Sequence, residues 1–374
     1  MDRAAALNPR AAAAALAPVA RELSDDAERE RRLPDRLAGA LRDSGLPRML
    51  VPASQGGGEV APLEMVEALE ELAVADASAA WCAMVSATAG YVCAYLEPSA
   101  AETVFGSGAV AAGVYAPMGE AKRDGDEYVV TGRWPFASFS AHADLLLGGA
   151  RTGEGVRLAV FEAGDVELHD TWDVSGLRGT GSGDMSVTEV RVPASHTASL
   201  AAPPAEEGAL YDFPVFGLLA LGIAAVAMGA ARGAIDDLRA LAVAKKPGGS
   251  RRLLAERPTV QADVARAAAA VAAARALVVE TVDRAWAMAS SGAGVSVEER
   301  TRLRLAATHA TRASAGAVDL MYEAGGGTSI YSRSPLQRRF RDVHAATQHA
   351  MVAPATWELT GRLLLGQDTD VTQL

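Results

Sequence analysis

The chain has 374 residues, of which 50% are hydrophobic and 22% charged, values that exclude a disordered chain, a collagen-like repeat and a coiled coil. The formal net charge of -11 disfavours a nucleic-acid partner, because an acidic surface repels phosphates. The only two cysteines, Cys82 and Cys93, provide neither a disulfide framework nor a C-x-x-C motif, which favours a reducing cytoplasm. The alanine-rich start predicts a first helix, since its charges and Pro9 interrupt the apolar run of a signal peptide.

The character of the sequence changes twice along the chain. Residues 1–112 carry apolar side chains at helical spacing, for example Leu63, Val66, Leu69 and Leu72. Residues 113–205 contain short β-branched runs separated by Gly, Asp and Pro. Residues 206–374 return to long alanine- and leucine-rich stretches. We therefore predict a mostly α protein with a central β unit: an N-terminal helical domain, a middle β domain and a C-terminal helical bundle with these boundaries.

One apolar stretch, residues 213–231, is uncharged and nearly long enough to cross a bilayer. It contains Pro214, several glycines and alanines, and no basic flank. These features are typical of a helix buried on all sides in a bundle. We predict a core helix and no contact with a membrane.

A glycine-rich loop, SGLRGTGSGD, is the first candidate site. Its glycines would let a planar ligand or a phosphate approach the main chain, and Arg178, Thr180 and Ser182 supply hydrogen-bond donors. A flexible hairpin would explain the same composition. Because the loop leads into a strand-like segment and not a helix, a P-loop or dinucleotide-binding fingerprint is excluded.

A second candidate, GRWPFASFSAHAD, follows a predicted strand. It combines the aromatic rings of Trp134 and Phe136 with the hydroxyl of Ser138 and the imidazole of His142. This combination suits a ring-shaped ligand. The alternative is a core tryptophan followed by polar residues at the end of a strand.

The third candidate is a helix start near residue 334. Ser334 as N-cap, Pro335 at the first position and Gln337 at the third predict a capping box. Free N–H groups at a helix start attract anions, and four arginines concentrate positive charge here: Arg333, Arg338, Arg339 and Arg341. The segment predicts a phosphate site, with a surface ion pair between Arg338 and Asp342 as the alternative.

The fourth candidate is His349, which we expect on the same helix and the same face as Asp342, two turns further on. His344 falls on another side of that helix, so the two histidines do not form a zinc pair and no metal site is predicted. A histidine beside an apolar cavity could act as a base near neutral pH; an ordinary packed or exposed histidine is the alternative.

These motifs together resemble the acyl-CoA dehydrogenase fold, and within it the two-component flavin-dependent monooxygenases, which include hydroxyphenylacetate, dibenzothiophene and secosteroid hydroxylases. The resemblance spans almost the whole chain through GLPRMLVPASQGGGEV, DASAAW, YAPMGEAKRDGDEYVVTGRWPFASFSAHAD, WDVSGLRGTGSGD, RPTVQADVARA and YEAGGGTSIYSRSPLQRRFRDVHAATQH. It implies reduced FMN or FAD as cofactor, supplied by a separate reductase, with O2 as co-substrate. It leaves the choice between FMN and FAD open.

The resemblance also implies roles for individual residues. The flavin ring and ribityl chain would lie against Trp134, Ser138, Arg178, Thr180 and Ser182. Ser138 would bind near flavin N5, and His142 would polarise the flavin hydroperoxide or orient the substrate. The phosphate end would meet a second group, which a neighbouring subunit could contribute: Gln261, Arg338, Arg339 and Arg341.

The choice between dehydrogenase and monooxygenase depends on which residue could act as the catalytic base. A dehydrogenase needs a carboxylate, yet the next acidic residue after Asp342 is Glu358, and His349 stands within one residue of the usual glutamate position. We therefore expect oxygenation through a C4a-hydroperoxyflavin, with His349 deprotonating a phenol-like hydroxyl or holding the peroxide. One departure is Phe139, where these monooxygenases often have glycine after the serine.

The resulting hypothesis is an oxygenase that hydroxylates an aromatic, phenolic or other specialised-metabolite substrate. The enzymatic alternatives are an acyl-CoA dehydrogenase-like desaturase and an N-oxygenase of an amino group. A catalytically silent binding or scaffold subunit is the alternative from another class. The family resemblance further implies a homotetramer.

Overall fold

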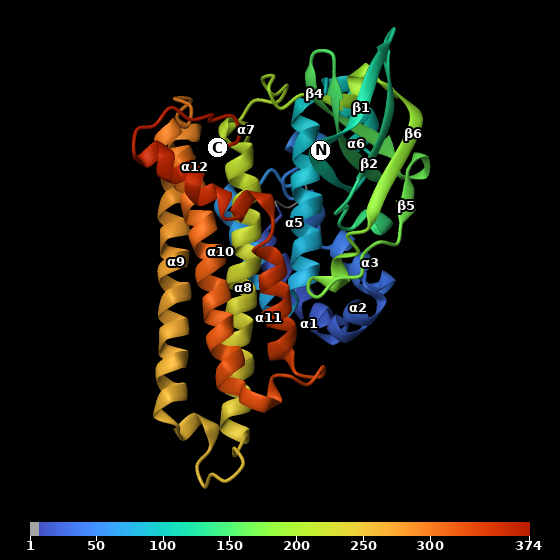
Figure 1. Cartoon of the computed structure of the whole chain (residues 1–374). Coiled ribbons are helices and arrows are strands. Elements are labelled where there is room, and N and C mark those ends of the chain that lie inside the picture. The colour runs from blue at the N-terminus through green and yellow to red at the C-terminus, as the bar shows by residue number, and fades with distance from the viewer. Residues whose placement is uncertain (1–6) are drawn as a thin grey trace. The chain divides into compact units, whose positions relative to one another are not determined.

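The computed structural model describes residues 7–374, so the first six residues of the predicted first helix lie outside it (Figure 1). Contacts group the chain into two units. Unit 1 contains the chain up to Ala61 together with Trp81–Val174 and Arg178–Tyr211, and unit 2 contains Pro62–Ala80, Ser175–Leu177 and Asp212–Leu374. The predicted order of helices, β unit and helical bundle is confirmed. The two predicted boundaries between the three domains stay a prediction.

Unit 1 joins the β unit to helices from the start of the chain. The helices are α1 (Pro9–Glu22), α2 (Ser24–Glu30), α3 (Asp35–Asp43), α5 (Ala77–Tyr91, from Trp81 onward) and α6 (Pro98–Phe105). Asn8 caps α1 by accepting the Ala11 N–H at 3.0 Å, and Pro9 occupies its first turn, as expected for a helix start. The unit ends at Tyr211, within the short α7 (Ala209–Asp212).

The sheet of unit 1 has the order β5-β6-β2-β1-β3-β4-β7, and every neighbouring pair is antiparallel except β1 with β3. The strands are β1 (Ala111–Asp124), β2 (Glu127–Trp134), β3 (Leu145–Thr152), β4 (Gly155–Glu162), β5 (Glu167–His169), β6 (Asp184–Pro193) and β7 (Thr197–Ala198), and the sheet is seen at the upper right of Figure 1. The parallel pair brings the end of β2 and the start of β3 into the same layer, with the segment Pro135–Asp144 between them.

Trp134 occupies a slot inside this sheet. The side chain is 0% exposed, and its Nε1 donates to the Gly149 carbonyl at 2.7 Å. A Cβ atom on Gly119, Gly132 or Gly148 would come within 2.5–2.7 Å of an indole carbon. Three strands therefore carry glycine where the ring lies, because no side chain fits beside it. The alternative of a core tryptophan is the one that the structure supports.

Gly148→Ala is expected to lower the free energy of unfolding by about 1–3 kcal/mol, because a new methyl would overlap a buried ring that has no space to move. Urea unfolding followed by circular dichroism measures the difference. Gly153→Ala is the control, since nothing lies within 4 Å of a Cβ at that position. Equal losses in the two variants would show that the slot is not tightly packed.

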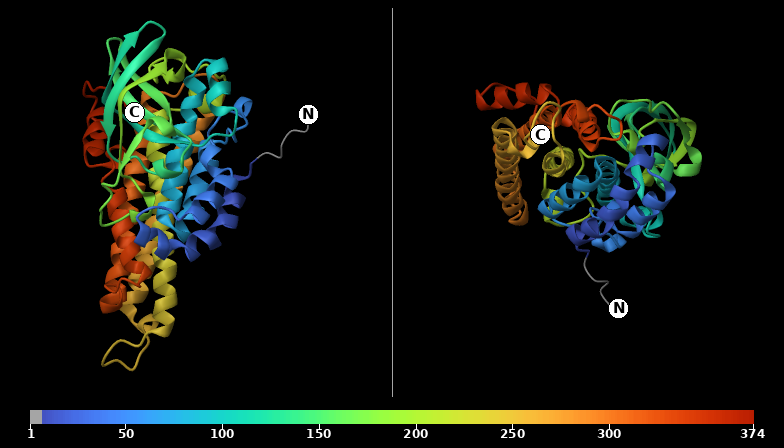
Figure 2. Two further views of the ribbon diagram at one scale, coloured as in Figure 1. Left: turned by 90° about the vertical axis from the view of Figure 1, so that its right-hand side faces the viewer. Right: turned by 90° about the horizontal axis from the view of Figure 1, so that it is seen from below.

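Unit 2 is a helical bundle in which α8, α9 and α10 run side by side (Figures 1 and 2). Its helices are α4 (Pro62–Ala75), α8 (Val215–Ala244), α9 (Pro258–Ser290), α10 (Val297–Gly325), α11 (Pro335–Ala346) and α12 (Ala355–Leu364). Helix α8 contains the apolar stretch, and 78% of its most apolar window is buried, as is 94% of a second apolar segment, Ala77–Tyr95. Both are core helices, as predicted for the first.

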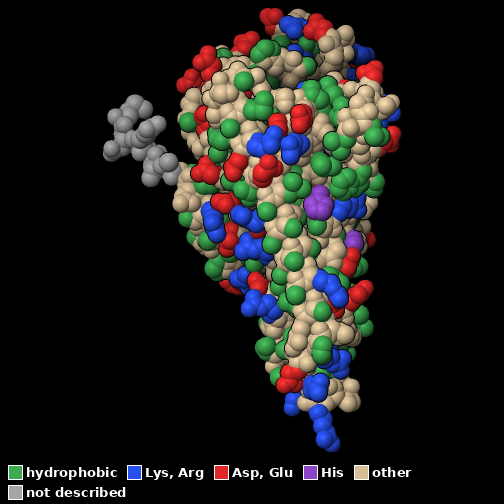
Figure 3. Space-filling view, turned by 90° about the vertical axis from the view of Figure 1, so that its left-hand side faces the viewer, with side chains coloured by type: hydrophobic (Ala, Val, Ile, Leu, Met, Phe, Trp, Pro, Cys, Tyr) green, Lys and Arg blue, Asp and Glu red, His purple; other side chains and the backbone are tan. Residues whose placement is uncertain are grey.

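Small residues let α4 and α8 approach closely. A Cβ on Gly229 would lie 2.3 Å from the Glu70 carbonyl oxygen and 2.6 Å from the Ala73 side chain. At the far end of α8, the loop to α9 carries lysines and arginines that form a basic tip (Figure 3). This tip is separated along the helices from the C-terminal segment that carries the candidate histidine.

Candidate functional site

The glycine-rich loop is divided between the two units. Its start, Ser175–Leu177, belongs to unit 2, where the Leu177 N–H donates to the Asp342 carboxylate at 2.7 Å. A Cβ on Gly176 would meet the Arg341 carbonyl oxygen at 2.1 Å, so only glycine fits against α11. Asp342 therefore holds the loop. The remainder of the loop, from Arg178, belongs to unit 1.

Three buried hydroxyls form a chain in unit 1. Ser138 Oγ lies 2.6 Å from Ser182 Oγ, which lies 2.6 Å from Thr180 Oγ1. The Trp81 indole N–H donates to Ser138 Oγ at 3.2 Å. All four side chains are at most 7% exposed. The structure thus brings Ser138, Thr180 and Ser182 together, as expected, and adds Trp81.

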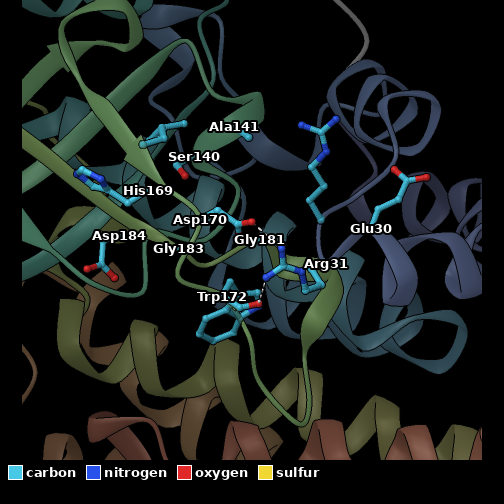
Figure 4. Close-up of a pocket in the computed structure, with 12 residues that line it drawn as sticks. Glu30, Arg31, Ser140, Ala141, His169, Asp170, Trp172, Gly181, Gly183 and Asp184 are labelled. Carbon is cyan, nitrogen blue, oxygen red and sulfur yellow. Dashed lines mark hydrogen bonds and ion pairs between the residues drawn. The ribbon is translucent and has the colours of Figure 1, made fainter.

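A hollow of about 410 Å³ opens beside this chain of hydroxyls, still within unit 1 (Figure 4). Gly181 and Gly183, which flank Ser182, line it, and Gly181 has φ +58°, a conformation that glycine adopts without strain. Arg31 crosses the hollow, binding the Asp170 carboxylate at 2.6 Å and the Trp172 carbonyl at 3.2 Å. The other lining residues are Glu30, Arg32, Ser140, Ala141, Leu168, His169 and Asp184.

The exposed aromatic surface comes from Phe136 and Trp172, and not from Trp134. Phe136 is 68% exposed, and its ring meets that of Trp172 edge to face, with centroids 6.2 Å apart. Its φ of +66° is unusual for a residue with a bulky side chain. The predicted ligand contact of Trp134 is therefore corrected: its ring is enclosed by the sheet, and Phe136, two residues later, offers the accessible face.

Phe139 stands where the family resemblance leads one to expect a glycine, and the structure shows how a phenylalanine fits there. Its φ is +63°, in the left-handed region that glycine enters freely. The side chain is 1% exposed and packs on His142, with ring centroids 5.4 Å apart. The backbone has kept a conformation suited to glycine, while the phenylalanine ring fills the interior.

Phe139→Gly is expected to be more stable than Phe139→Ala by about 1 kcal/mol, because both lose the ring and only glycine is relieved of the left-handed strain. This order is the reverse of the usual one in regular structure. Both variants should be less stable than the parent, by about 3–5 kcal/mol for the alanine form. Parallel denaturant titrations would measure the order; alanine equal to or above glycine would contradict the strain.

Two predicted site residues in unit 1 have structural partners instead. His142 Nε2 donates to the Leu33 carbonyl at 2.9 Å, and burial lowers the pKa of His142, so the imidazole is neutral. Arg178 donates to the carbonyls of Glu28 and Val174 at 3.3 and 2.8 Å. These bonds tie the site loops to the N-terminal helices. The predicted contacts of His142 with substrate and of Arg178 with flavin stay predictions.

The arginine cluster of α11 is also largely engaged inside unit 2. Arg339 is 8% exposed and binds the Asp237 carboxylate at 3.2 Å and the carbonyls of Ala73 and Val74 at 2.9 and 2.7 Å. Arg341 donates to Gln337 Oε1 at 2.7 Å and to the Ser175 carbonyl. Both guanidinium groups hold helices and loops together, and their predicted contact with a phosphate stays a prediction.

The start of α11 follows the prediction only in part. Pro335 occupies the first turn, but the Ser334 side chain makes no capping bond, and Gln337 instead binds the Ser332 carbonyl at 3.0 Å. The predicted capping box is therefore wrong. Arg338 is half-buried on the same helix, and Gln261, on α9, donates to the Ala255 carbonyl at 2.9 Å.

His349 does not lie on the helix where it was expected. Helix α11 ends at Ala346, and His349 begins a short turn, Ala350–Val352, whose Met351 N–H donates to His349 Nδ1 at 3.2 Å. The side chain is exposed at one side, yet the surrounding protein and the Arg304 charge lower the pKa of His349 to about 4. The imidazole is therefore neutral at pH 7.

Sequence reasoning missed Trp81 and Trp172 as site residues, and it did not show that Phe136 would be the exposed ring and Trp134 the buried one. Trp81 ends the motif DASAAW, but its distance of 57 residues from Ser138 hides the hydrogen bond between them. Phe136 was visible in the same motif as Trp134. The alternation of side chains along a strand stops at its end, so spacing alone does not show which ring is buried.

Models of two protein families match the chain. The acyl-CoA dehydrogenase N-terminal domain matches residues 8–102, and the acyl-CoA dehydrogenase C-terminal domain matches residues 221–354. Together they cover more than half of the chain, on both sides of the β unit.

Several characterised proteins are similar over nearly their whole length. An indole-3-acetate monooxygenase of Pseudomonas putida is 32% identical, with 91% of this chain and 89% of that protein covered. The flavin-dependent monooxygenase oxygenase subunit HsaA of Rhodococcus jostii is 30% identical, with 91% and 93% covered. Among solved structures, XiaF from a Streptomyces species, in complex with FADH2 and glycerol, has a TM-score of 0.91 at 26% identity, with 98% of each chain covered.

Proposed function

Because this chain belongs to the acyl-CoA dehydrogenase family, in its branch of two-component flavin-dependent monooxygenases, we propose that it is the oxygenase component that hydroxylates an aromatic or phenolic substrate. It is an oxidoreductase that depends on reduced flavin and O2. A separate reductase supplies the flavin, since relatives bear the names oxygenase subunit and oxygenase component.

The donor set of unit 1 fits a flavin. An isoalloxazine is a flat ring with nitrogen and oxygen atoms along one edge. Unit 1 offers the exposed Phe136 ring and the half-buried Trp172 ring, together with the hydroxyls of Ser138, Thr180 and Ser182. Because Gly181 and Gly183 have no side chains, a flavin can approach the backbone closely at these two positions. When bound, reduced flavin supplies the two electrons that activate O2.

The hydroxyl chain supports a role for Ser138 as the donor to the cofactor. Ser138 Oγ accepts the Trp81 N–H, and it accepts a second proton when the chain runs from Thr180 through Ser182. A hydroxyl that accepts both bonds has its own proton left for a ligand. Thr180 and Ser182 thereby orient Ser138 and need not touch the cofactor.

The observation that favours oxygenation over desaturation is the set of residues in the segment after α11. It presents His349 as a neutral imidazole, and the chain has no acidic residue between Asp342 and Glu358. Removing an α-proton from a thioester requires a base of the kind that this segment lacks. A neutral histidine can instead hold a reacting oxygen or a substrate hydroxyl.

An isotope experiment tests the proposed function. The protein is mixed anaerobically with chemically reduced FAD or FMN, then given ¹⁸O2 and a panel of indoles, phenols and amines. We expect one ¹⁸O atom in the product and the second in water. A product that has lost two hydrogens without gaining ¹⁸O would instead establish the desaturase, and labelling of the amines alone would establish the N-oxygenase.

For the assembly, we propose a cytoplasmic homotetramer in which Arg338 and Gln261 meet the phosphate end of a flavin bound by a neighbouring copy. The exposed apolar side chains of α12 and its end, Trp357, Leu364 and Leu365, support burial against another subunit. Light scattering after size exclusion measures the mass. A monomer that still binds flavin at full strength would contradict the shared site.

A further inference from the structure

His349 sits in the middle of a five-residue loop, Thr347–Met351, which we name the histidine loop. Turn hydrogen bonds order its backbone: the His349 N–H donates to the Ala346 carbonyl at 3.2 Å, and the Val352 N–H donates to the His349 carbonyl at 3.0 Å. These local bonds leave the loop's other carbonyls to be satisfied from elsewhere in unit 2.

Two arginines of α10 bind the two ends of the histidine loop. Arg312 Nη2 donates to the Thr347 carbonyl at 3.0 Å, and Arg304 Nη2 donates to the Met351 carbonyl at 2.9 Å. Eight residues, or about two turns, separate these arginines, so they lie on the same face of α10. Each holds a carbonyl two residues away from His349, one before it and one after.

Burying the guanidinium group of Arg304 costs free energy of folding. It is 2% exposed, and burial lowers its pKa to about 10, which still leaves it charged at neutral pH. Within residues 7–374 it forms no ion pair; its partners are the Met351 carbonyl and the Gln373 carbonyl of the C-terminal segment. A buried guanidinium bonded only to carbonyls contributes less to stability than an apolar side chain of similar size. Stability therefore does not account for an arginine at this position, and its effect is to fix the conformation of the histidine loop.

The same loop sets the tautomer of His349. Nδ1 accepts the Met351 N–H, so the proton of the neutral ring is on Nε2. The carbonyl of Met351 is the one bound by Arg304, and the peptide that orients the ring is thus fixed from α10.

We propose that Arg304 and Arg312 are positioning residues that hold His349 as an Nε2–H hydrogen-bond donor at the reacting oxygen. This inference rests on the proposed oxygenase function and changes the expected role of His349 from proton acceptor to donor. The positive charge of Arg304 acts in the same direction, because it lowers the pKa of His349 and so opposes protonation of Nδ1.

A first test uses no cofactor. Histidine with ¹³C and ¹⁵N in the ring is incorporated, and the His349 signal is assigned by its loss in His349→Gln. We expect the Nε2–H tautomer in the parent between pH 6 and 8, and a mixture of tautomers with a raised pKa in Arg304→Met. Arg266→Met is the control, since Arg266 is exposed and pairs with Asp263 on the surface of α9. An Nδ1–H ring in the parent, or an unchanged signal in Arg304→Met, would overturn the inference.

A second test is a double-mutant cycle on the ratio of oxygenated product to hydrogen peroxide. Arg304→Met and Arg312→Met should each lower this ratio about tenfold, and neither should lower it further in the His349→Ala background. Full additivity in that background would mean that the arginines act only through stability. If Arg304→Met fails to fold, Arg304→Lys and Arg312→Met carry the test. A parent that makes no labelled product refutes the proposed function, while the tautomer experiment still decides the geometry.

Discussion

His349→Ala is expected to consume reduced flavin at the parent rate, release hydrogen peroxide, and form at least about 100-fold less oxygenated product. The reason is that the histidine loop offers the reacting oxygen one neutral imidazole and no carboxylate that could replace it. Flavin binding should be retained. The measurement is product by mass spectrometry and peroxide by a peroxidase assay, in the same reaction.

The control for this prediction is His309→Ala, because His309 is an exposed histidine on α10. A second variant, His349→Gln, distinguishes a donor from a base: the glutamine amide places an N–H near the position of Nε2, so it should keep product within about tenfold of the parent. If His349→Gln lost as much product as His349→Ala, the result would indicate that His349 acts as a base and not as a hydrogen-bond donor. Parent-level product from His349→Ala would remove it from the site.

The pH dependence follows from the lowered pKa of His349. The folded pKa is about 4, against 6.5 for a free imidazole, so between these values the unfolded chain binds a proton that the folded chain does not. This group therefore stabilises the fold above pH 6.5, and its contribution is lost as the pH falls toward 4. Product formation should show no ionisation of His349 between pH 6 and 8.

Glu70→Ala is expected to lower the free energy of unfolding by about 1–3 kcal/mol, because two charged hydrogen bonds to a buried carboxylate are lost. The Glu70 side chain is 2% exposed and joins α4 to two further helices, through Arg232 at 3.0 Å and Arg275 at 2.9 Å. Removing this buried carboxylate breaks both ion pairs, while Arg275 keeps its bond to Glu67 and both guanidinium groups remain partly exposed to solvent. Denaturant unfolding followed by fluorescence and circular dichroism measures the loss.

Glu67→Ala is the matched control, because Glu67 lies on the same helix and binds the same Arg275, at 3.0 Å, but is 30% exposed. Its loss should cost about 0–1 kcal/mol, since solvent screens an exposed ion pair. Equal effects of the two substitutions would show that burial does not decide the strength of this cluster.

The sequence was sufficient for the order of the elements and for the chemical types at the site. Periods of 3.6 and of 2 are local properties, so the helices of α8 to α10 and the strands of the β unit could be predicted from neighbouring residues. The hydroxyls of Ser138, Thr180 and Ser182 also met as expected, because each lies on a loop between predicted strands.

What the sequence could not decide was which side chain of a given type faces a ligand and which one supports the fold. Arg339 and Arg338 are adjacent, yet Arg339 binds carbonyls of α4, 265 residues away along the chain. Trp134 is enclosed because three strands each contribute a glycine, and His349 left its helix because α11 ends at Ala346.

The sequence alone therefore determined a protein of helices around a central β unit. It also determined the glycine-rich loop, the hydroxyl side chains of the candidate site, and a histidine where a dehydrogenase would have its catalytic carboxylate. The tertiary structure alone decided that His349 lies on a loop braced by Arg304 and Arg312, with its proton on Nε2. The physical reason is that hydrogen-bond partners are chosen by proximity in space, and periodicity carries no information about partners tens of residues apart.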